Sequence, residues 1–283
     1  MGVFRRVTAA DRLSCGGLDV EMQPDEGSAV FEEAVFTRRV LQFSGNSFYE
    51  QGMKRAPGIF MTKITQYSAV HLMTEAGADP GKYNALPRPD VIEKTAQEIE
   101  KRGIKVVIAE NGADALAVLK KLIPPGAEVM NGSSTTLIEI GYEEFIATKQ
   151  SEWNLVHTKI TAENDAGKRA ELRRRSVAAD YFISSANAIA ESGEIVACDA
   201  SGSRVGAWPF AAGHLILVVG VNKIVPTLED ALDRIRNYVF RLENARAQRA
   251  YGTPSILGKC VILAHEKSEG RITLVLVKEA LGY

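Results

Sequence analysis

Hydrophobic and polar positions follow two alternating periods from about residue 90 onward. Short apolar runs predict strands, and apolar residues spaced three or four positions apart predict helices. The predicted strands cover 104–109, 128–130, 181–184, 195–198, 215–221, 261–264 and 272–277. The predicted helices cover 90–102, 113–122, a segment starting near residue 137, 166–178 and 228–242. This alternation predicts an α/β fold with a largely parallel central sheet and helices on both faces.

Three features mark predicted helix ends. Gly103 follows the helix at 90–102 as a C-cap glycine. Thr136 and Glu139 have the spacing of a capping box at the start of the helix near residue 137, and Thr227 and Asp230 are placed to cap the helix that follows them. The segment 104–109 is predicted to be a buried strand.

The first part of the chain lacks a sustained period. Residues 1–60 contain short apolar runs broken by glycine and proline, which indicates an amino-terminal appendage; alternatively, Met61 is the natural start. A short helix at 69–75 and a proline-rich linker follow within 61–89. The main domain is predicted to span 90–283.

Composition and charge narrow the classes of partner. The chain has 283 residues, 34 basic and 35 acidic side chains, a net charge of −1 and 46% hydrophobic residues, which is typical of a compact globular protein. Near-neutral charge argues against nucleic acid as the main partner. The longest apolar stretch, 215–221, is far shorter than the roughly 18 residues of a membrane span, and the amino terminus lacks a signal-peptide core. A cytoplasmic protein without a membrane span is predicted.

Cysteine and histidine usage gives no metal or cofactor signature. Cys15, Cys198 and Cys260 form an odd set without a C-x-x-C pair, which excludes ferredoxin, zinc-ribbon and thioredoxin motifs. All three are predicted to be reduced thiols. The four histidines lack metal-ligand spacing, so no metal site is predicted and no cofactor is identified.

Ligands of parallel sheets collect at the carboxyl ends of strands, and a small polar loop follows the strand at 128–130. Its backbone N–H groups and hydroxyls can hold an anion at the start of the next helix, although a plain N-cap loop has the same composition. The candidate substrate-binding residues of this loop are Gly132, Ser133, Ser134, Thr135 and Thr136.

The loop after the strand at 181–184 contains Ser185, Asn187 and Glu191. Glu191, between small residues and before a Ser-Gly turn, is the candidate catalytic residue, as nucleophile or general base. The alternative is a solvated glutamate in a turn.

Two further strand-end loops carry cations. Arg204 can grip a carboxylate or phosphate, or simply pair with Asp199. Asn222 and Lys223 follow the strand at 215–221, where the lysine is either an anion contact or a surface charge. Convergence of several loops is how such folds build sites, so an anionic small molecule is the predicted ligand.

Four motifs, in this order and spacing, resemble the LUD domain of the lactate-utilisation family. They are NGSSTTLIEIG at 131–141, ADYFISSANAIAESGEIV at 179–196, SRVGAW at 203–208 and VGVNKIV at 219–225. The resemblance covers about residues 90–250. It implies a three-layer α/β/α fold similar to the CoA-transferase and sugar-phosphate isomerase superfamily. It also implies that Glu191 lies in the segment bearing a catalytic acid.

The resemblance supports two functions, and whether the chain is itself an enzyme stays open between them. The first is a non-redox subunit or accessory factor in the oxidation of L-lactate to pyruvate, beside an iron–sulfur partner subunit. The second is an independent CoA-transferase or isomerase-like enzyme that acts on an anionic small molecule through Glu191. A structural homo-oligomer is a third option. Several relatives carry a cysteine-rich tail after the long helix, which Thr253, Pro254 and Ser255 replace here.

Overall fold

The computed structural model describes residues 68–148 and 151–283, so the predicted appendage at 1–60 and Cys15 lie outside the described residues. Within this part, the central sheet has six strands in the order β1-β10-β7-β4-β2-β3, and every neighbouring pair is parallel. The strands are β1 (Lys105–Ala109), β2 (Glu128–Asn131), β3 (Asn154–Leu155), β4 (Tyr181–Ser184), β7 (His214–Gly220) and β10 (Ile272–Val277).

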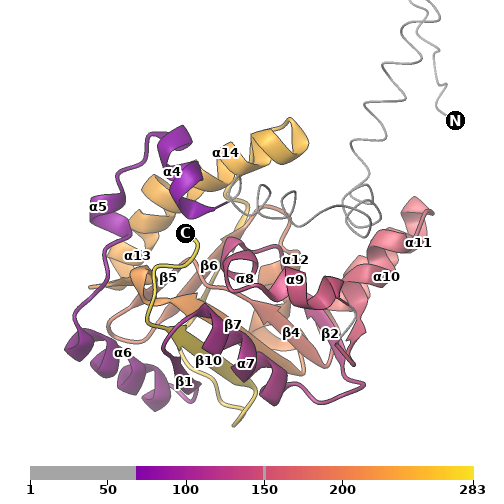
Figure 1. Cartoon of the computed structure of the whole chain (residues 1–283), viewed down its shortest axis with the longest axis horizontal. Coiled ribbons are helices and arrows are strands. Elements are labelled where there is room, and N and C mark those ends of the chain that lie inside the picture. Colours follow the sequence, from indigo (N-terminus) through magenta and orange to yellow (C-terminus); the bar gives the residue numbers. More distant parts are fainter. Residues whose placement is uncertain (1–67, 149–150) are drawn as a thin grey trace, which may run out of the picture. The chain divides into compact units, whose positions relative to one another are not determined.

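Helices cover the central sheet on both sides (Figure 1). Side chains alternate along β7, so Leu215 and Leu217 pack on one face while Ile216 and Val218 pack on the other. The first face meets α6 (Pro89–Lys101) and α12 (Ser203–Gly206); the second meets α7 (Gly112–Leu122), α8 (Thr135–Glu139) and α9 (Tyr142–Ala147). The predicted three-layer α/β/α arrangement is confirmed.

A second, four-stranded sheet packs beside α6 on the first face. Its order is β8-β5-β6-β9, formed by β5 (Ala188–Ala190), β6 (Ile195–Asp199), β8 (Ile224–Val225) and β9 (Lys259–Leu263). Ile195 and Ala197 of β6 face the central sheet, whereas Val196 and Cys198 face the helices α4 (Ala69–Ala76), α13 (Leu228–Arg234) and α14 (Phe240–Tyr251). The strands predicted at 195–198 and 261–264 therefore form, but pair antiparallel in this smaller sheet.

The remaining helices complete the outer layers. They are α5 (Pro80–Tyr83), inside the predicted linker, α10 (Val156–Ala162) and α11 (Ala166–Arg175). A π-helical turn, Ile235–Val239, joins α13 to α14. No helix in the described ranges is both long and apolar enough to cross a membrane.

The buried strand predicted at 104–109 is wrong in one respect. It forms β1, but β1 is an edge strand whose described strand partner is β10 alone, and Ile108 is 41% exposed. Apolar runs do not distinguish central from edge strands, because the strand order is set by crossovers far apart in the sequence.

One of the two predicted helix caps forms. The Thr227 hydroxyl accepts the backbone N–H of Asp230 at 3.1 Å and caps α13. The other prediction is wrong, since Ser134 caps α8 by accepting the N–H of Leu137. The helix begins before Thr136, which leaves Thr136 free for tertiary contacts.

Thr227→Ala is expected to lower the free energy of unfolding by about 1 kcal/mol, because the N–H of Asp230 loses its acceptor at the helix start. Urea unfolding measures the change. The control is Thr253→Ala at an exposed position, which should shift stability by less than about 0.5 kcal/mol. An equal effect of both substitutions would contradict the capping role.

The prediction of three reduced thiols is wrong for two of them. Cys198 and Cys260 form a disulfide across 62 residues of sequence, with Cα atoms 4.1 Å apart. They are register partners in the antiparallel pair β6–β9, and this pairing places the two side chains together. Nothing in the spacing of the cysteines indicated it.

Candidate functional site

Lys223 is the centre of a buried polar cluster at the carboxyl end of β7. It ends the 3₁₀ turn Val221–Lys223 and is only 1% exposed. Its Nζ donates to the Thr136 hydroxyl at 2.9 Å, the Ser185 hydroxyl at 3.0 Å and the carbonyl of Ala186 at 3.2 Å. Three loops predicted to converge therefore meet at one ammonium group.

Burial holds the pKa of Lys223 well below its usual range, and the positive charges of Arg234 and Arg204 lower it further. Glu139 acts in the opposite direction. Because the unfolded chain keeps this proton to the ordinary pKa of 10.5, folding in the charged state carries a cost.

The contribution of Lys223 to the stability of the protein is therefore expected to rise with pH between the lowered pKa of folded Lys223 and 10.5. In that window the unfolded state binds more protons than the folded state. Urea unfolding from neutral pH to about pH 10 should show the stability of Lys223→Met exceeding that of the wild type by an amount that shrinks as pH rises. If the difference in unfolding free energy between Lys223→Met and the wild type does not change with pH, burial of a charged Lys223 does not cost stability.

Arg234, the last residue of α13, is fully buried and lies beside the segment 185–187, which also contacts Lys223. Its Nε donates to the carbonyl of Tyr83 at 3.2 Å, and its Nη1 donates to the carbonyl of Asn187. Its Nη2 is buried and has no hydrogen-bond partner among the described residues. Burial lowers the pKa of Arg234 to about 10.

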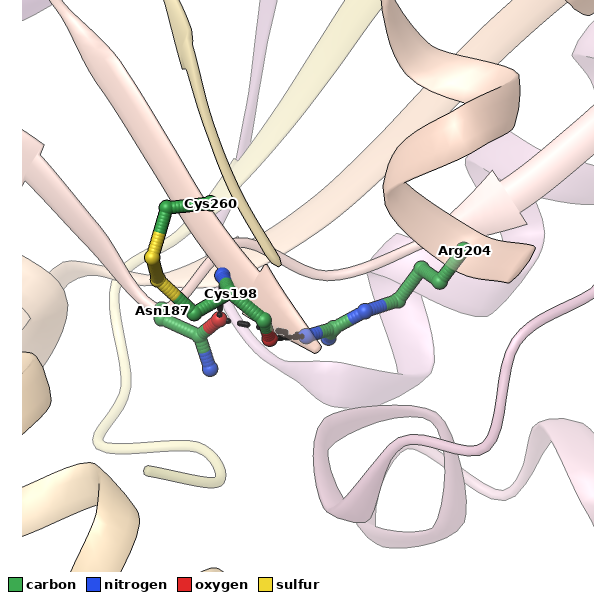
Figure 2. Close-up of a disulfide and its surroundings, with 4 residues drawn as sticks. All are labelled: Asn187, Cys198, Arg204 and Cys260. Carbon is green, nitrogen blue, oxygen red and sulfur yellow. Dashed lines mark hydrogen bonds between the residues drawn. A yellow bond between two sulfur atoms is a disulfide. The ribbon is translucent and has the colours of Figure 1, made fainter. Parts of the chain in front are cut away.

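Arg204 extends from α12 toward Asn187 and Cys198 (Figure 2). Its Nη1 donates to the carbonyl of Ser185 at 3.3 Å, and its Nη2 donates to Asn187 Oδ1 at 3.1 Å and to the carbonyl of Cys198. The Asp199 carboxylate instead accepts the backbone N–H of Arg204 at 2.9 Å. Burial lowers the pKa of Arg204, against the charge of Asp199.

Arg204, Lys223 and Arg234 form what we term the cation cluster around residues 185–187. All ion pairs found in the described part of the chain involve other residues. Lys223 and Arg234 are buried, and Arg204 is partly buried. A buried charge without an ion-pair partner costs several kcal/mol, so an anion bound beside these side chains would lower that cost. The unpartnered Nη2 of Arg234 offers a donor for it.

The segment 279–283 lies over this cluster. The carbonyl of Leu281 accepts from the Thr136 hydroxyl at 3.4 Å, and the backbone N–H of Gly282 donates to Glu139 at 2.6 Å. Asn222 accepts the N–H of Leu281 at 3.1 Å and donates to the carbonyl of Gly282 at 3.4 Å. The segment therefore packs closely beside Lys223, since an added Cβ at Gly282 would lie 3.2 Å from Lys223 Nζ.

The loop at 131–136 contributes unequally. Gly132 packs against the Arg204 side chain, where an added Cβ would lie 3.2 Å from Cδ. Thr135 is buried and bonds Tyr283, whereas Ser133 is exposed and Ser134 caps α8. Sequence analysis offered an anion-binding loop or a plain N-cap loop, and Ser134 acts as the N-cap. Thr136 instead contacts Lys223 of the cation cluster.

Glu191 does not join the cation cluster. It lies in the turn between β5 and β6, where its backbone N–H bonds the carbonyl of Val225 at 2.9 Å. Asn187 stands at the other end of β5, four residues away, or about 13 Å along an extended chain. The catalytic role of Glu191 stays a prediction separate from this site.

Sequence reasoning missed Arg234, because the helix 228–242 was interpreted only by its apolar positions. A signal existed: Arg234 lies three residues after Ala231 and four before Tyr238, and both of these are fully buried. A charged residue in line with two core positions of a helix is a candidate for a buried site. The described ranges contain no group of three or more His, Cys, Asp or Glu placed to hold a metal ion.

Comparisons with known proteins agree with the motifs. The model of the LUD domain family matches residues 92–282. Among solved structures, a DUF162 family protein from Deinococcus radiodurans is 13% identical, with a TM-score of 0.38, and the match covers 68% of this chain and 99% of that one. A search of curated proteins finds no significant match.

Proposed function

Because the chain belongs to the LUD domain family, we propose that it serves L-lactate oxidation to pyruvate as a non-redox subunit or accessory factor. At family level the LUD domain supports a role related to lactate utilisation. In this proposal the cation cluster holds the carboxylate of lactate or pyruvate, and an iron–sulfur partner subunit carries the electrons. The protein acts in the cytoplasm.

One observation supports this assignment above the others: Lys223 and Arg234, both buried, and the partly buried Arg204 surround residues 185–187 without a carboxylate in ion-pair contact among the described residues. A carboxylate would neutralise this charge and accept from Arg234 Nη2. The hydroxyls of Ser185 and Thr136 lie within reach of the same group, since both contact Lys223 Nζ. They are suited to bond the 2-hydroxyl or 2-oxo group beside the carboxylate.

The test is calorimetric titration of the full chain with L-lactate and pyruvate, with lactamide as the uncharged control. Lactate or pyruvate should bind and lactamide should not. Arg234→Met is expected to weaken binding at least about a hundredfold, the loss of a charge-assisted contact with a desolvated anion. Arg234→Lys should weaken it less, because the charge stays but the planar fork is lost.

Binding unaffected by Arg234→Met would contradict the site, and failure of both acids to bind would contradict the ligand class. Co-purification tests the subunit role, which fails if no iron–sulfur protein accompanies the chain from lactate-grown cells. Glu191→Gln tests the other predicted function. If Glu191→Gln abolishes a measured transferase or isomerase activity while leaving lactate binding intact, the protein is an enzyme with a separate centre.

A further inference from the structure

The disulfide between Cys198 and Cys260 links the edge strand β9 to β6, and Cys198 of β6 contacts Arg204 of the cation cluster. Within the described residues β9 pairs only with β6, so one edge of β9 has no strand partner. Cys260 is exposed, whereas Cys198 is 7% exposed. A thiol from solution therefore reaches the Cys260 sulfur first.

Cys198 is also in direct contact with the groups that orient Arg204 (Figure 2). Its backbone N–H donates to Asn187 Oδ1 at 2.8 Å, and its carbonyl accepts from Arg204 Nη2. Asn187 Oδ1 accepts from the same Nη2 at 3.1 Å. The backbone of Cys198 and the side chain of Asn187 thus hold one edge of the Arg204 guanidinium.

The chain on either side of the disulfide also contacts the start of α12, the helix that carries Arg204. Lys259, next to Cys260, packs its stem on Gly202, where an added Cβ would lie 2.5 Å from Lys259 Cδ. The Asp199 carboxylate, next to Cys198, accepts the backbone N–H groups of Gly202, Arg204 and Val205. A shift of β9 relative to β6 therefore moves both the groups that bond the Arg204 guanidinium and the start of the helix α12 that carries Arg204.

We propose that the Cys198–Cys260 disulfide is a reversible thiol switch that controls the anion affinity of the cation cluster. The ligand part of this proposal rests on the proposed function. In the cytoplasm a disulfide that persists only transiently is typical of redox sensing rather than of structural stabilisation. The oxidised form holds Arg204 in place, and the reduced form releases β9.

The reductant is a dithiol. One of its thiolates attacks the Cys260 sulfur, the S–S bond breaks, and Cys198 leaves as a thiolate that takes up a proton. The second thiol of the reductant then attacks the mixed disulfide and releases Cys260 as a thiol. The protein pair gains two electrons and two protons, and the dithiol is oxidised to a disulfide.

The experiment uses the full chain carrying Cys15→Ser, so that free thiols report only this pair. Defined ratios of reduced and oxidised dithiothreitol set the redox state, and maleimide labelling counts the thiols. Hydrogen exchange, which needs no ligand, is then compared between the states. Reduction should speed exchange of the Cys198, Arg204 and Val205 amides about tenfold or more, because their acceptors become mobile.

Titration with L-lactate completes the test, and about tenfold weaker binding is expected in the reduced state, the loss of one charge-assisted contact. Cys260→Ser should show the reduced affinity and no response to dithiothreitol. Faster exchange without lactate binding in either state would support the coupling of the disulfide to Arg204 while contradicting the proposed ligand, whereas lactate affinity that is equal in both states would overturn the control of anion affinity. Equal exchange in both states, or thiols that never pair under oxidised dithiothreitol, would overturn the switch.

Discussion

Lys223→Met is expected to raise the free energy of unfolding by about 1–3 kcal/mol at neutral pH and to abolish the binding of small carboxylates. Methionine is unbranched and similar in length, so it fills the same space without a charge. Lys223 forms no ion pair within the described residues, so its replacement leaves no carboxylate without its ion-pair partner. Stability gained where function is lost is the signature of a binding site.

The hydroxyls and the carbonyl that accept from Lys223 can form hydrogen bonds with one another or with neighbouring groups after the lysine is replaced. The hydroxyls of Ser185 and Thr136 lie 3.2 Å apart, and each also lies 3.4 Å from a carbonyl oxygen, of Ala186 and Leu281 respectively. The desolvation cost of a buried ammonium disappears, while few hydrogen bonds are left unmade.

Urea unfolding and calorimetric titration with L-lactate measure the two effects of Lys223→Met. Lys121→Met is the matched control, since it makes the same substitution at an exposed position. It should change neither quantity appreciably. If Lys223→Met lowers stability and leaves binding intact, Lys223 is a structural tie between loops and the site lies elsewhere.

Gly282→Ala is expected to lower the free energy of unfolding by about 2–4 kcal/mol and to expose Lys223 to amine reagents. Gly282 has φ +60°, and an added Cβ would lie 2.3 Å from the Thr136 hydroxyl and 3.2 Å from Lys223 Nζ. The backbone N of Thr136, 3.0 Å away, limits any adjustment. The segment 279–283 must therefore lift from the cation cluster.

Urea unfolding measures the stability, and acetylation followed by mass spectrometry measures the reactivity of Lys223. The control is Gly126→Ala, which has φ +79° but nothing within 4 Å of the added Cβ. It carries only the conformational cost, about 1 kcal/mol, and leaves Lys223 unreactive. Equal effects of both variants would show that the close approach of Gly282 does not cover the site.

Much of the fold follows from local pattern. The strands β4, β7 and β10 are continuous apolar runs with few alternatives, and α13 begins at a threonine that caps it as predicted. Loops at the carboxyl ends of parallel strands meet at one edge, so Thr136, Ser185 and Lys223 could be grouped before their contacts were known. These inferences need only periods, caps and strand direction, which neighbouring residues encode.

The remaining features depend on contacts between distant parts of the chain. Arg234 enters the site because α13 packs over β5, and Cys198 meets Cys260 because β9 pairs with β6 across 62 residues. Glu191 and Asn187 share a loop in sequence, yet β5 extends between them and separates them. Sequence by itself determined most of the α/β elements and two members of the cation cluster, Arg204 and Lys223. Only the tertiary structure decided that Lys223 and Arg234 are buried and that the cation cluster forms no ion pair within the described residues, because burial and charge compensation depend on which distant elements pack together.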